Sequence, residues 1–101
     1  MADNWQKVGE EAQFAQGLHL VRVNGKKVVV GTVAGKLYAF DALCPHAGGP
    51  MELSECEGAI VSCPLHAWRF DLQDEGRELH GYRPLPLKKV KTEGGAVWVT
   101  E

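Results

Sequence analysis

Hydrophobic and polar positions alternate most clearly in the first half of the chain, where they predict a β-hairpin. Residues 21–23 and 28–30 are rich in β-branched side chains and flank the dipeptide Asn24-Gly25. This dipeptide readily takes the positive φ values of a type I′ turn, which joins two antiparallel strands. Residues 36–40 then alternate polar or small side chains with large apolar ones, as a half-buried strand does. The sequence therefore predicts a three-stranded meander.

The C-terminal part of the chain contains a second predicted hairpin. Strand-like runs at residues 85–91 and 96–99 are separated by Glu93-Gly94-Gly95, which is a typical turn sequence. Pro84 and Pro86 have no N–H group to donate to a neighbouring strand. We therefore expect this segment to enter the sheet from an edge.

Residues 41–83, between the two hairpins, are rich in proline and glycine, and their apolar runs are short. We expect turns to dominate there, and only residues 10–16, earlier in the chain, suggest a single helical turn. No internal repeat or low-complexity linker interrupts the chain. The pattern predicts an all-β protein with a loop-rich insertion, folded as a single domain over residues 1–101.

Composition and charge are those of an ordinary globular protein. Of the 101 residues, 45% are hydrophobic and 24% are charged, so we expect a folded chain. A formal net charge of −2 gives no strong field to attract nucleic acid or anionic lipid, and neither partner is expected. No apolar run approaches the roughly 20 residues that cross a bilayer, and residues 1–5 do not resemble a signal peptide. The predicted location is the cytoplasm.

The cysteines suggest metal binding rather than a disulfide framework. Three cysteines leave one unpaired, and a reducing compartment disfavours disulfides. Two of the three stand close to histidines, in the segments Cys44-Pro45-His46 and Cys63-Pro64-Leu65-His66. Proline and glycine in and around these segments favour tight turns that direct backbone N–H groups inward, toward sulfur.

The two segments form the pattern C-x-H-x16-C-x2-H, which resembles that of the Rieske family. The resemblance extends to Gly48, to Pro50-Met51 and to residues 68–71. It implies an antiparallel β-sandwich or barrel scaffold with an inserted cluster-binding subdomain at about residues 41–83.

The resemblance also implies one [2Fe–2S] cluster, with one iron held by two cysteines and the other by two histidines. The residues in those positions are Cys44, Cys63, His46 and His66. Each histidine would bind iron through one ring nitrogen and keep the other at or near solvent. The same ligand types also build structural zinc sites, which would make the protein an interaction module. The short C-x-H segment weighs against zinc.

The oxidised cluster with two thiolates and two neutral imidazoles is formally neutral, so it accepts an electron more easily than an all-cysteine cluster. Histidine ligation moves potentials from about −400 mV to between about −150 and +300 mV. High-potential members of the family carry an additional disulfide and a hydroxyl that bonds a sulfur. Gly49 and Leu65 stand at the disulfide positions here, and Ala67-Trp68 follows the second histidine. We therefore expect a potential near the low end, at about −150 mV.

The resemblance implies a small soluble one-electron carrier that passes electrons from a reductase to a terminal oxygenase or a similar redox enzyme. The sequence contains no evident nucleophile or general-base pair, so we do not expect an enzyme. A small subunit of an assimilatory nitrite reductase is the main alternative. The Rieske domain of an oxygenase is a weaker one, because the chain has no room for a mononuclear iron domain.

The remaining reactive residues have simpler interpretations. Cys56 matches no ligand position, and we expect a free or packed thiol whose pKa is raised by neighbouring carboxylates. His19 is predicted to lie in a strand and His80 in a loop, neither as a ligand. The acidic residues Glu52, Glu55 and Glu57 either dock a basic partner or form an ordinary solvated face.

Four aromatic residues complete these expectations. We expect Trp68 and Phe70 to pack in the core or to cover the cluster. Trp5 and Trp98 are expected to fill the β core.

Overall fold

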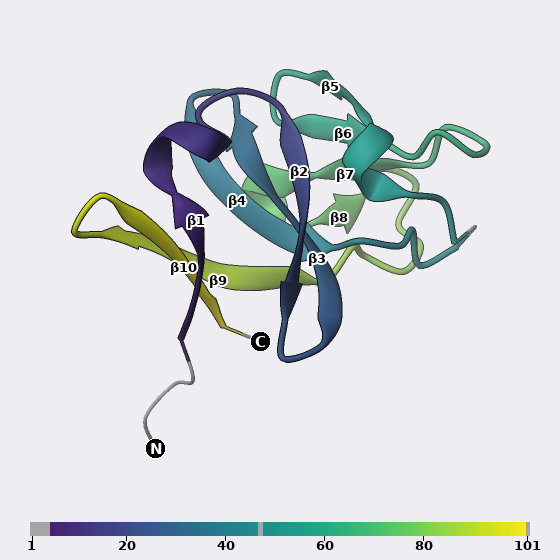
Figure 1. Ribbon diagram of the computed structural model, residues 1–101. Coiled ribbons are helices and arrows are strands. Elements are labelled where there is room, and N and C mark those ends of the chain that lie inside the picture. The colour runs from purple at the N-terminus through teal and green to yellow at the C-terminus, as the bar shows by residue number, and fades with distance from the viewer. Residues whose placement is uncertain (1–4, 47, 101) are drawn as a thin grey trace.

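The computed structural model describes residues 5–46 and 48–100 (Figure 1). This part of the chain contains ten β-strands and three short 3₁₀-helices, and no α-helix. The strands form two antiparallel sheets, and the all-β prediction is confirmed. None of the helices in the described ranges is long and apolar enough to cross a membrane.

The larger sheet has six strands in the order β1-β10-β9-β4-β3-β2. Its strands are β1 (Gln6–Glu10), β2 (Leu18–Val23), β3 (Lys26–Val33), β4 (Lys36–Asp41), β9 (Leu87–Glu93) and β10 (Ala96–Thr100). The side chain of Gln6 on β1 accepts a hydrogen bond of 2.8 Å from the backbone N–H of Asn24, beside β2. The two edges of the sheet therefore approach each other, and the sheet is nearly a closed barrel (Figure 1).

The predicted meander is confirmed as β2, β3 and β4. Asn24 and Gly25 have φ values of 51° and 79°, as a type I′ turn requires, and Val23 pairs with Lys26 across it. Ala34 and Gly35 repeat this conformation between β3 and β4, with φ values of 52° and 80°. The expected helical turn is also present, as the 3₁₀-helix η1 (Glu11–Phe14).

The C-terminal hairpin is confirmed as β9 and β10, but the expected edge position is wrong. Strand β9 lies between β10 and β4. Both prolines precede the strand, which begins at Leu87, so their missing N–H groups interrupt no pairing within β9. The carbonyl of Pro86 still accepts a hydrogen bond of 3.0 Å from the N–H of Asp41.

The middle of the chain has more regular structure than the sequence predicts. A second sheet has the order β5-β6-β7-β8, with strands β5 (Glu55–Glu57), β6 (Ile60–Ser62), β7 (Arg69–Asp71) and β8 (Arg77–Glu78). The helices η2 (Met51–Leu53) and η3 (Leu72–Asp74) complete it. Strands of two or three residues are too short to show alternation in a sequence, so turns seemed to dominate this segment.

Strand β3 separates two hydrophobic cores, because successive side chains on a strand point to opposite faces. Val28 and Val30 face a barrel core within the larger sheet, together with Phe14, Val23, Ala39, Val97 and Val99. Val29 and Val33 face an intersheet core, together with Tyr38, Phe40, Ala42, Cys44, Met51, Val61, Cys63, Phe70, Leu72 and Leu85. Two predicted ligands thus belong to the core that joins the sheets.

The positions of Trp5 and Trp98 differ from the expectation. Both are only half-buried, and neither belongs to a core. The ammonium group of Lys91 lies 4.6 Å from the centre of the Trp5 ring, and Trp98 donates a hydrogen bond of 3.4 Å to the carbonyl of Glu93. These two side chains therefore cover the outside of the barrel.

Gly31 on β3 is the glycine at which we expect substitution to be most costly. A Cβ atom there would overlap the carbonyl oxygen of Gly17, and this backbone atom cannot move without disturbing β2. We expect Gly31→Ala to lower the free energy of unfolding by about 3 kcal/mol, the upper end of typical overpacking costs. Urea unfolding measures this value.

Gly9→Ala is the matched control for this prediction. The nearest atom to an added Cβ at Gly9 is Oε1 of Gln13, at 2.6 Å, at the end of a flexible side chain. We expect a smaller loss, of about 1 kcal/mol. Equal losses for the two variants would contradict the role given to the Gly17 carbonyl.

Candidate metal centre

The first predicted ligand segment is a tight loop between β4 and η2. The N–H of Cys44 donates to the carbonyl of Gly49 at 3.0 Å, and the N–H of Gly48 donates to the carbonyl of Cys44 at 2.8 Å. Just beyond the loop, the N–H of Met51 donates to the carbonyl of Ala42 at 2.8 Å. Met51 is fully buried. The core side chain therefore anchors the end of the loop.

The second segment is a turn between β6 and β7 that closes on itself. The N–H of Cys63 donates to the carbonyl of Trp68 at 2.7 Å. Between them, His66 and Ala67 have left-handed φ values of 65° and 55°. Such values cost a non-glycine residue about 1 kcal/mol or more and often mark functional sites. This turn and the first loop project from the same end of the molecule (Figure 1).

The two cysteine thiols lie side by side at the base of these loops. Cys44 and Cys63 are only 3% and 2% exposed, and the Cys44 side chain is near enough to act on the pKa of Cys63. The N–H groups of Leu65, at 3.4 Å, and Gly49 point at the sulfur of Cys63. The prediction that the turns direct backbone N–H groups toward sulfur is confirmed.

Burial raises the pKa of the Cys63 thiol, and the neighbouring Cys44 raises it further. The two backbone N–H groups oppose this effect only in part. A metal ion deprotonates the thiols that bind it. The paired, buried thiols are therefore suited to bind iron rather than to exist as free thiolates.

Gly49 and Leu65, the residues at the disulfide positions of high-potential family members, face each other. A Cβ atom at position 49 would lie 3.4 Å from the Cβ atom of Leu65, close to the separation of the Cβ atoms in a disulfide. The same atom would lie only 2.6 Å from the sulfur of Cys63. The absence of a side chain at Gly49 thus leaves space beside this sulfur.

His46 is half-buried and is held on two sides. Its ring stacks on Trp68 with 4.1 Å between centroids and 14° between planes, and Tyr82 meets it edge-on at 6.1 Å. Its Nε2 atom lies 2.9 Å from the backbone carbonyl oxygen of Arg83. The resemblance implied a ring nitrogen at or near solvent. In the structure, Nε2 faces a backbone carbonyl, a contact that no side-chain pattern in the sequence could reveal.

His66 is exposed in the turn between β6 and β7. It lines an open cavity of about 320 Å³ together with Ala67, Trp68, Glu78, His80 and Tyr82. Trp68 is half-buried and packs against the intersheet core, in which Phe70 is fully buried. The expectation of a core or covering role for these two aromatic residues is confirmed.

The donor set of two thiols and two imidazoles fits a two-iron cluster with mixed ligands. Within residues 5–46 and 48–100, no three His, Cys, Asp or Glu side chains converge on one point where an ion could sit. In a [2Fe–2S] cluster with mixed ligands, each iron takes only two protein ligands, so four-fold convergence is not required. A buried thiol pair at the base of the loops and imidazoles nearer the surface match this division.

The residues not expected to bind metal lie apart from the thiol pair. His19 is in β2 and His80 in a turn after β8, as predicted. Cys56 is exposed on β5, and its thiol is free. The pKa of Cys56 is raised, but partial burial is the cause rather than the neighbouring carboxylates.

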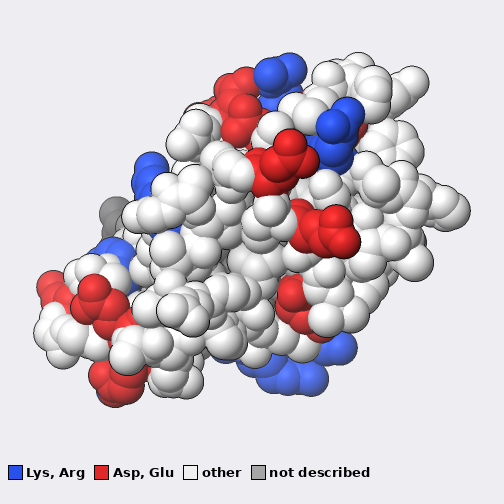
Figure 2. Space-filling view, turned by 90° about the horizontal axis from the view of Figure 1, so that it is seen from above, with Lys and Arg blue, Asp and Glu red and all other residues white. Residues whose placement is uncertain are grey.

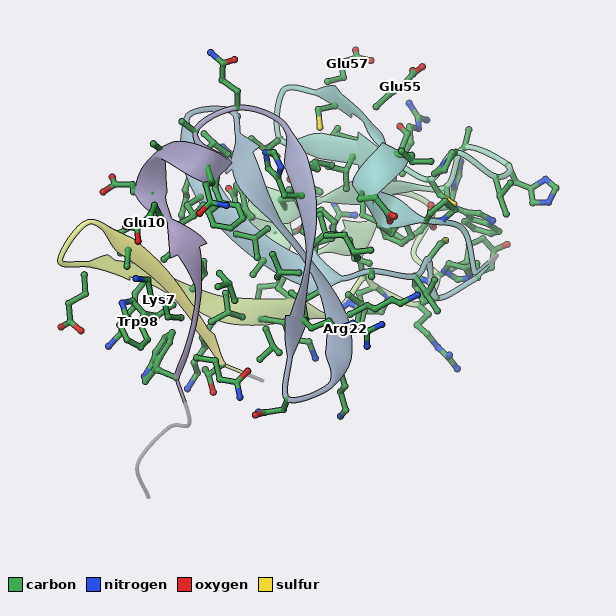
Figure 3. All side chains as sticks on the ribbon, in the orientation of Figure 1. Lys7, Glu10, Arg22, Glu55, Glu57 and Trp98 are labelled. Atoms are coloured by element: carbon green, nitrogen blue, oxygen red, sulfur yellow. The ribbon has the colours of Figure 1, made fainter. Side chains whose placement is uncertain are left out.

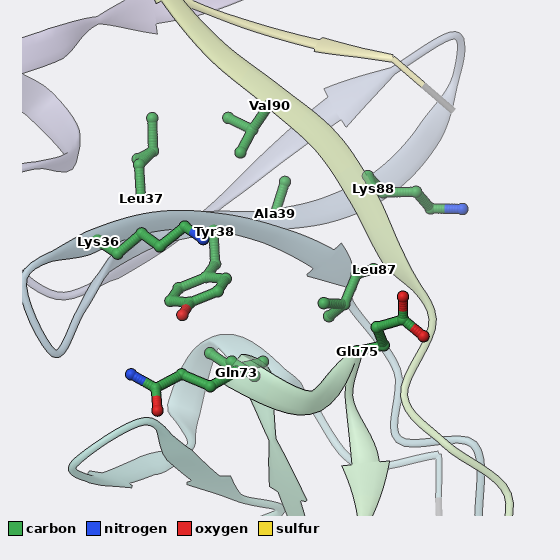
Figure 4. Close-up of a pocket in the computed structure, with 10 residues that line it drawn as sticks. Lys36, Leu37, Tyr38, Ala39, Gln73, Glu75, Leu87, Lys88 and Val90 are labelled. Atoms are coloured by element: carbon green, nitrogen blue, oxygen red, sulfur yellow. The ribbon is translucent and has the colours of Figure 1, made fainter.

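Another open cavity, of about 450 Å³, lies where β4 and β9 diverge (Figure 4). Lys36, Tyr38, Gln73 and Lys88 are among the residues that line it, and none of the predicted ligands is. The Tyr38 hydroxyl is buried and has no hydrogen-bond partner in the described part of the chain. The cavity is therefore separate from the metal centre.

A comparison with protein families matches residues 4–91 to the Rieske [2Fe–2S] domain. The chain is 39% identical over 74 residues to the oxygenase component of 3-ketosteroid-9-alpha-monooxygenase from Rhodococcus rhodochrous, covering 71% of this chain and 20% of that protein. It is 44% identical over 52 residues to the ferredoxin component of the naphthalene 1,2-dioxygenase/salicylate 5-hydroxylase systems from a Ralstonia species, covering 52% and 50%. The chain thus spans from a fifth to half of the length of these relatives.

Among solved structures, the ferredoxin of carbazole 1,9a-dioxygenase from Nocardioides aromaticivorans IC177 superposes with a TM-score of 0.82 and 27% identity. The superposition covers 95% of this chain and 96% of that ferredoxin, so the expected fold is confirmed. The family match extends over most of the chain and includes both ligand segments. The chain therefore belongs to the Rieske [2Fe–2S] domain family, whose cofactor is a [2Fe–2S] cluster.

Proposed function

We propose that this protein is a one-electron carrier that passes electrons from a reductase to a terminal oxygenase, and that it acts as a single domain in the cytoplasm. The observation that carries the proposal is the pair of buried thiols of Cys44 and Cys63, directly beneath exposed loops. A redox centre in that position is protected from water on one side and close to a partner on the other. The cofactor, when bound, supplies reversible one-electron chemistry.

The proposed ligands are Cys44 and Cys63 for the inner iron and His46 and His66 for the outer one. The thiol pair is supported by its burial and by the backbone N–H groups aimed at sulfur. The imidazoles are supported by their place in the two loops at the same end of the molecule. Such N–H groups stabilise negative charge on sulfur, which grows on reduction.

The part of the fold that carries these loops exposes apolar side chains that suit docking. Four of the five large hydrophobic side chains exposed in the described ranges lie in the middle segment: Leu43 (59%), Leu53 (66%), Leu65 (46%) and Tyr82 (62%). In Figure 2 the end that carries the loops, at the right, bears no Lys, Arg, Asp or Glu on the face that is shown. Exposed apolar surface of this kind is suited to a protein–protein contact.

Charge is divided unevenly between the two parts of the fold. Residues 42–86 contain seven carboxylates and three arginines, a formal charge of −4, whereas residues 5–41 and 87–100 contain four carboxylates and eight lysines or arginines, a formal charge of +4. The side chains of Glu55 and Glu57 project outward from β5 (Figure 3). This division favours approach of a basic partner surface to the part of the fold formed by residues 42–86, which carries the metal centre.

The alternative functions differ in the partner. The ferredoxin relatives belong to systems whose names include an oxygenase, which favours the oxygenase as electron acceptor. A small subunit of a nitrite reductase remains the second candidate. The ligand pair Cys44 and Cys63 is intact, so such a subunit would have to bear the cluster.

Purification of the tagged protein from its own source cells, followed by mass spectrometry, tests this choice. We expect a terminal oxygenase and a reductase to copurify in substoichiometric amounts, as transient partners do. A stoichiometric complex with the large subunit of a nitrite reductase would instead identify a subunit and overturn the carrier proposal.

The ligand assignment predicts the effect of removing each histidine. We expect the dithionite-reduced protein to give an EPR signal with an average g value below about 1.95, which is typical of mixed histidine–cysteine ligation. His46→Ala and His66→Ala should each abolish this signal, and His19→Ala should leave it unchanged because His19 lies in β2. An unaltered signal in either ligand variant would refute the assignment.

The expected potential is near the low end of the Rieske range, at about −150 mV. Around Cys63 the structure shows backbone N–H donors, and Gly49 and Leu65 cannot form the disulfide of the high-potential members. Spectroelectrochemical titration measures this value. A midpoint at or above roughly +100 mV would show that the missing disulfide and hydroxyl do not control the potential.

Gly49→Ala is expected to reduce the amount of bound cluster. The added methyl group would lie 2.6 Å from the sulfur of Cys63, so this sulfur would have to shift. Iron and acid-labile sulfide per chain should fall at least about two-fold after purification, as a loss of ligand preorganisation predicts. Leu53→Ala, at an exposed position in the same segment, serves as the control. Full occupancy in Gly49→Ala would contradict the steric argument.

The uneven charge predicts salt-dependent electron transfer to a basic acceptor. We expect the double variant Glu55→Gln/Glu57→Gln to reduce cytochrome c about two- to ten-fold more slowly than the original protein at low salt, and equally fast at high salt. Glu11→Gln removes a carboxylate from η1, in the other part of the fold, and should have little effect. Stopped-flow kinetics at several salt concentrations measures these rates. Rates that did not depend on salt would count against docking through Glu55 and Glu57.

A further inference from the structure

Glu78 is the only charged residue that is buried within residues 5–46 and 48–100, with 0% of its surface exposed. It lies on β8 and pairs with Phe70 of β7, beneath the loops of the metal centre. An isolated carboxylate in such a place would cost several kcal/mol unless hydrogen bonds compensate. The partners of Glu78 therefore indicate why the fold tolerates it.

The partners of Glu78 all come from the turn that follows it. Its Oε1 atom accepts hydrogen bonds from the N–H groups of His80, at 2.8 Å, and Tyr82, at 3.2 Å, and its Oε2 atom faces Nδ1 of His80 at 3.1 Å. Burial raises the pKa of Glu78, but these hydrogen bonds together outweigh it, and the pKa lies below its ordinary value. The carboxylate is therefore ionised at neutral pH and binds the turn strongly.

The turn that Glu78 holds leads directly to His46. The N–H of Gly81 donates to the carbonyl of Glu78 at 2.9 Å, and Gly81 supplies the left-handed φ of 88° that the turn needs. The chain then places the ring of Tyr82 against His46 and the carbonyl of Arg83 at 2.9 Å from its Nε2. Throughout residues 80–83, all of which are described, the hydrogen bonds lead either to Glu78 or to His46.

We propose that Glu78 is a positioning residue for His46, because its buried carboxylate fixes the turn that supplies both the hydrogen-bond acceptor and the aromatic cover of this imidazole. The inference rests on the proposed assignment of His46 as an iron ligand. A carbonyl that accepts the second ring N–H of a ligating histidine fixes the ring orientation and raises its basicity. Stronger donation stabilises the ferric state, so Glu78 lowers the reduction potential.

Two substitutions separate positioning from the effect of charge. Glu78→Gln removes the charge but keeps an oxygen that can accept from the N–H groups of His80 and Tyr82. Glu78→Asp keeps the charge, but its side chain is one methylene shorter and cannot reach both N–H groups. Both variants are measured as purified protein with the cluster bound, by spectroelectrochemical titration and by the ¹⁴N couplings of the histidine ligands in pulsed EPR.

Positioning predicts that Glu78→Asp changes the ¹⁴N couplings of one histidine and shifts the potential upward, while Glu78→Gln keeps the original couplings. Couplings that are unchanged in Glu78→Asp would overturn the inference. An upward shift in Glu78→Gln without one in Glu78→Asp would also overturn it, since charge alone would then account for the shift. Glu75→Gln, which removes an exposed carboxylate after η3, is the control and should change no coupling.

The EPR signals of the original protein and of His46→Ala show whether the inference about Glu78 or the proposed function has failed. Absence of a mixed-ligand signal in the original protein, or its persistence in His46→Ala, would refute the ligand assignment. A normal signal that is lost in His46→Ala, together with unaltered couplings in Glu78→Asp, would refute only the role of Glu78.

Discussion

The fold depends on keeping two thiols, from segments 19 positions apart, side by side in a hydrophobic core. Cys44 and Cys63 take part in the same intersheet core as Val29, Phe40 and Phe70, so the groups that bind metal also join the two sheets. Core packing leaves these sulfur atoms little freedom. The loops above them do not need to be rigid by themselves, because their bases are fixed by the core.

Histidine ligands require a different kind of support, because an imidazole near the surface cannot rely on burial. His46 is held by a stacked indole, an edge-on phenol ring and a backbone carbonyl. The carbonyl belongs to a turn organised by the buried carboxylate of Glu78. A polar network thus holds the imidazole in place, as the apolar core holds the thiols in place. The cost of burying the charge is offset by three interactions of the carboxylate, all with residues of one short turn.

Much of the barrel could be predicted from sequence, because its turns depend on local chemistry. Asn24-Gly25 and Gly94-Gly95 determine two hairpins through their positive φ values, and the strands beside them are long enough to show their pattern. The second sheet could not be predicted, since strands of two or three residues carry no periodicity. The location of β9 between two strands was also hidden, because it depends on pairing with β4, far away in the chain.

The candidate site also has some features that the sequence predicts and others that it does not. The family resemblance of the two cysteine–histidine segments implies the four ligands and the positions of Gly49 and Leu65, whose contact the structure confirms. No sequence pattern indicates that the carbonyl of Arg83 meets His46 or that Glu78 is buried, because both result from how a turn folds over a distant loop. Supporting interactions of this kind depend on tertiary structure, whereas the spacing of the ligands can be found in the sequence alone.

Strand β5 has a consequence for how copies of the protein behave at high concentration. It is the outer strand of the smaller sheet, and an outer strand offers unpaired N–H and C=O groups to any other chain. Here the strand has only three residues, all exposed, and two of them are glutamates. Two copies that met along this edge would bring like charges together, which opposes edge-to-edge aggregation. The same carboxylates that favour a basic partner therefore also keep identical copies apart.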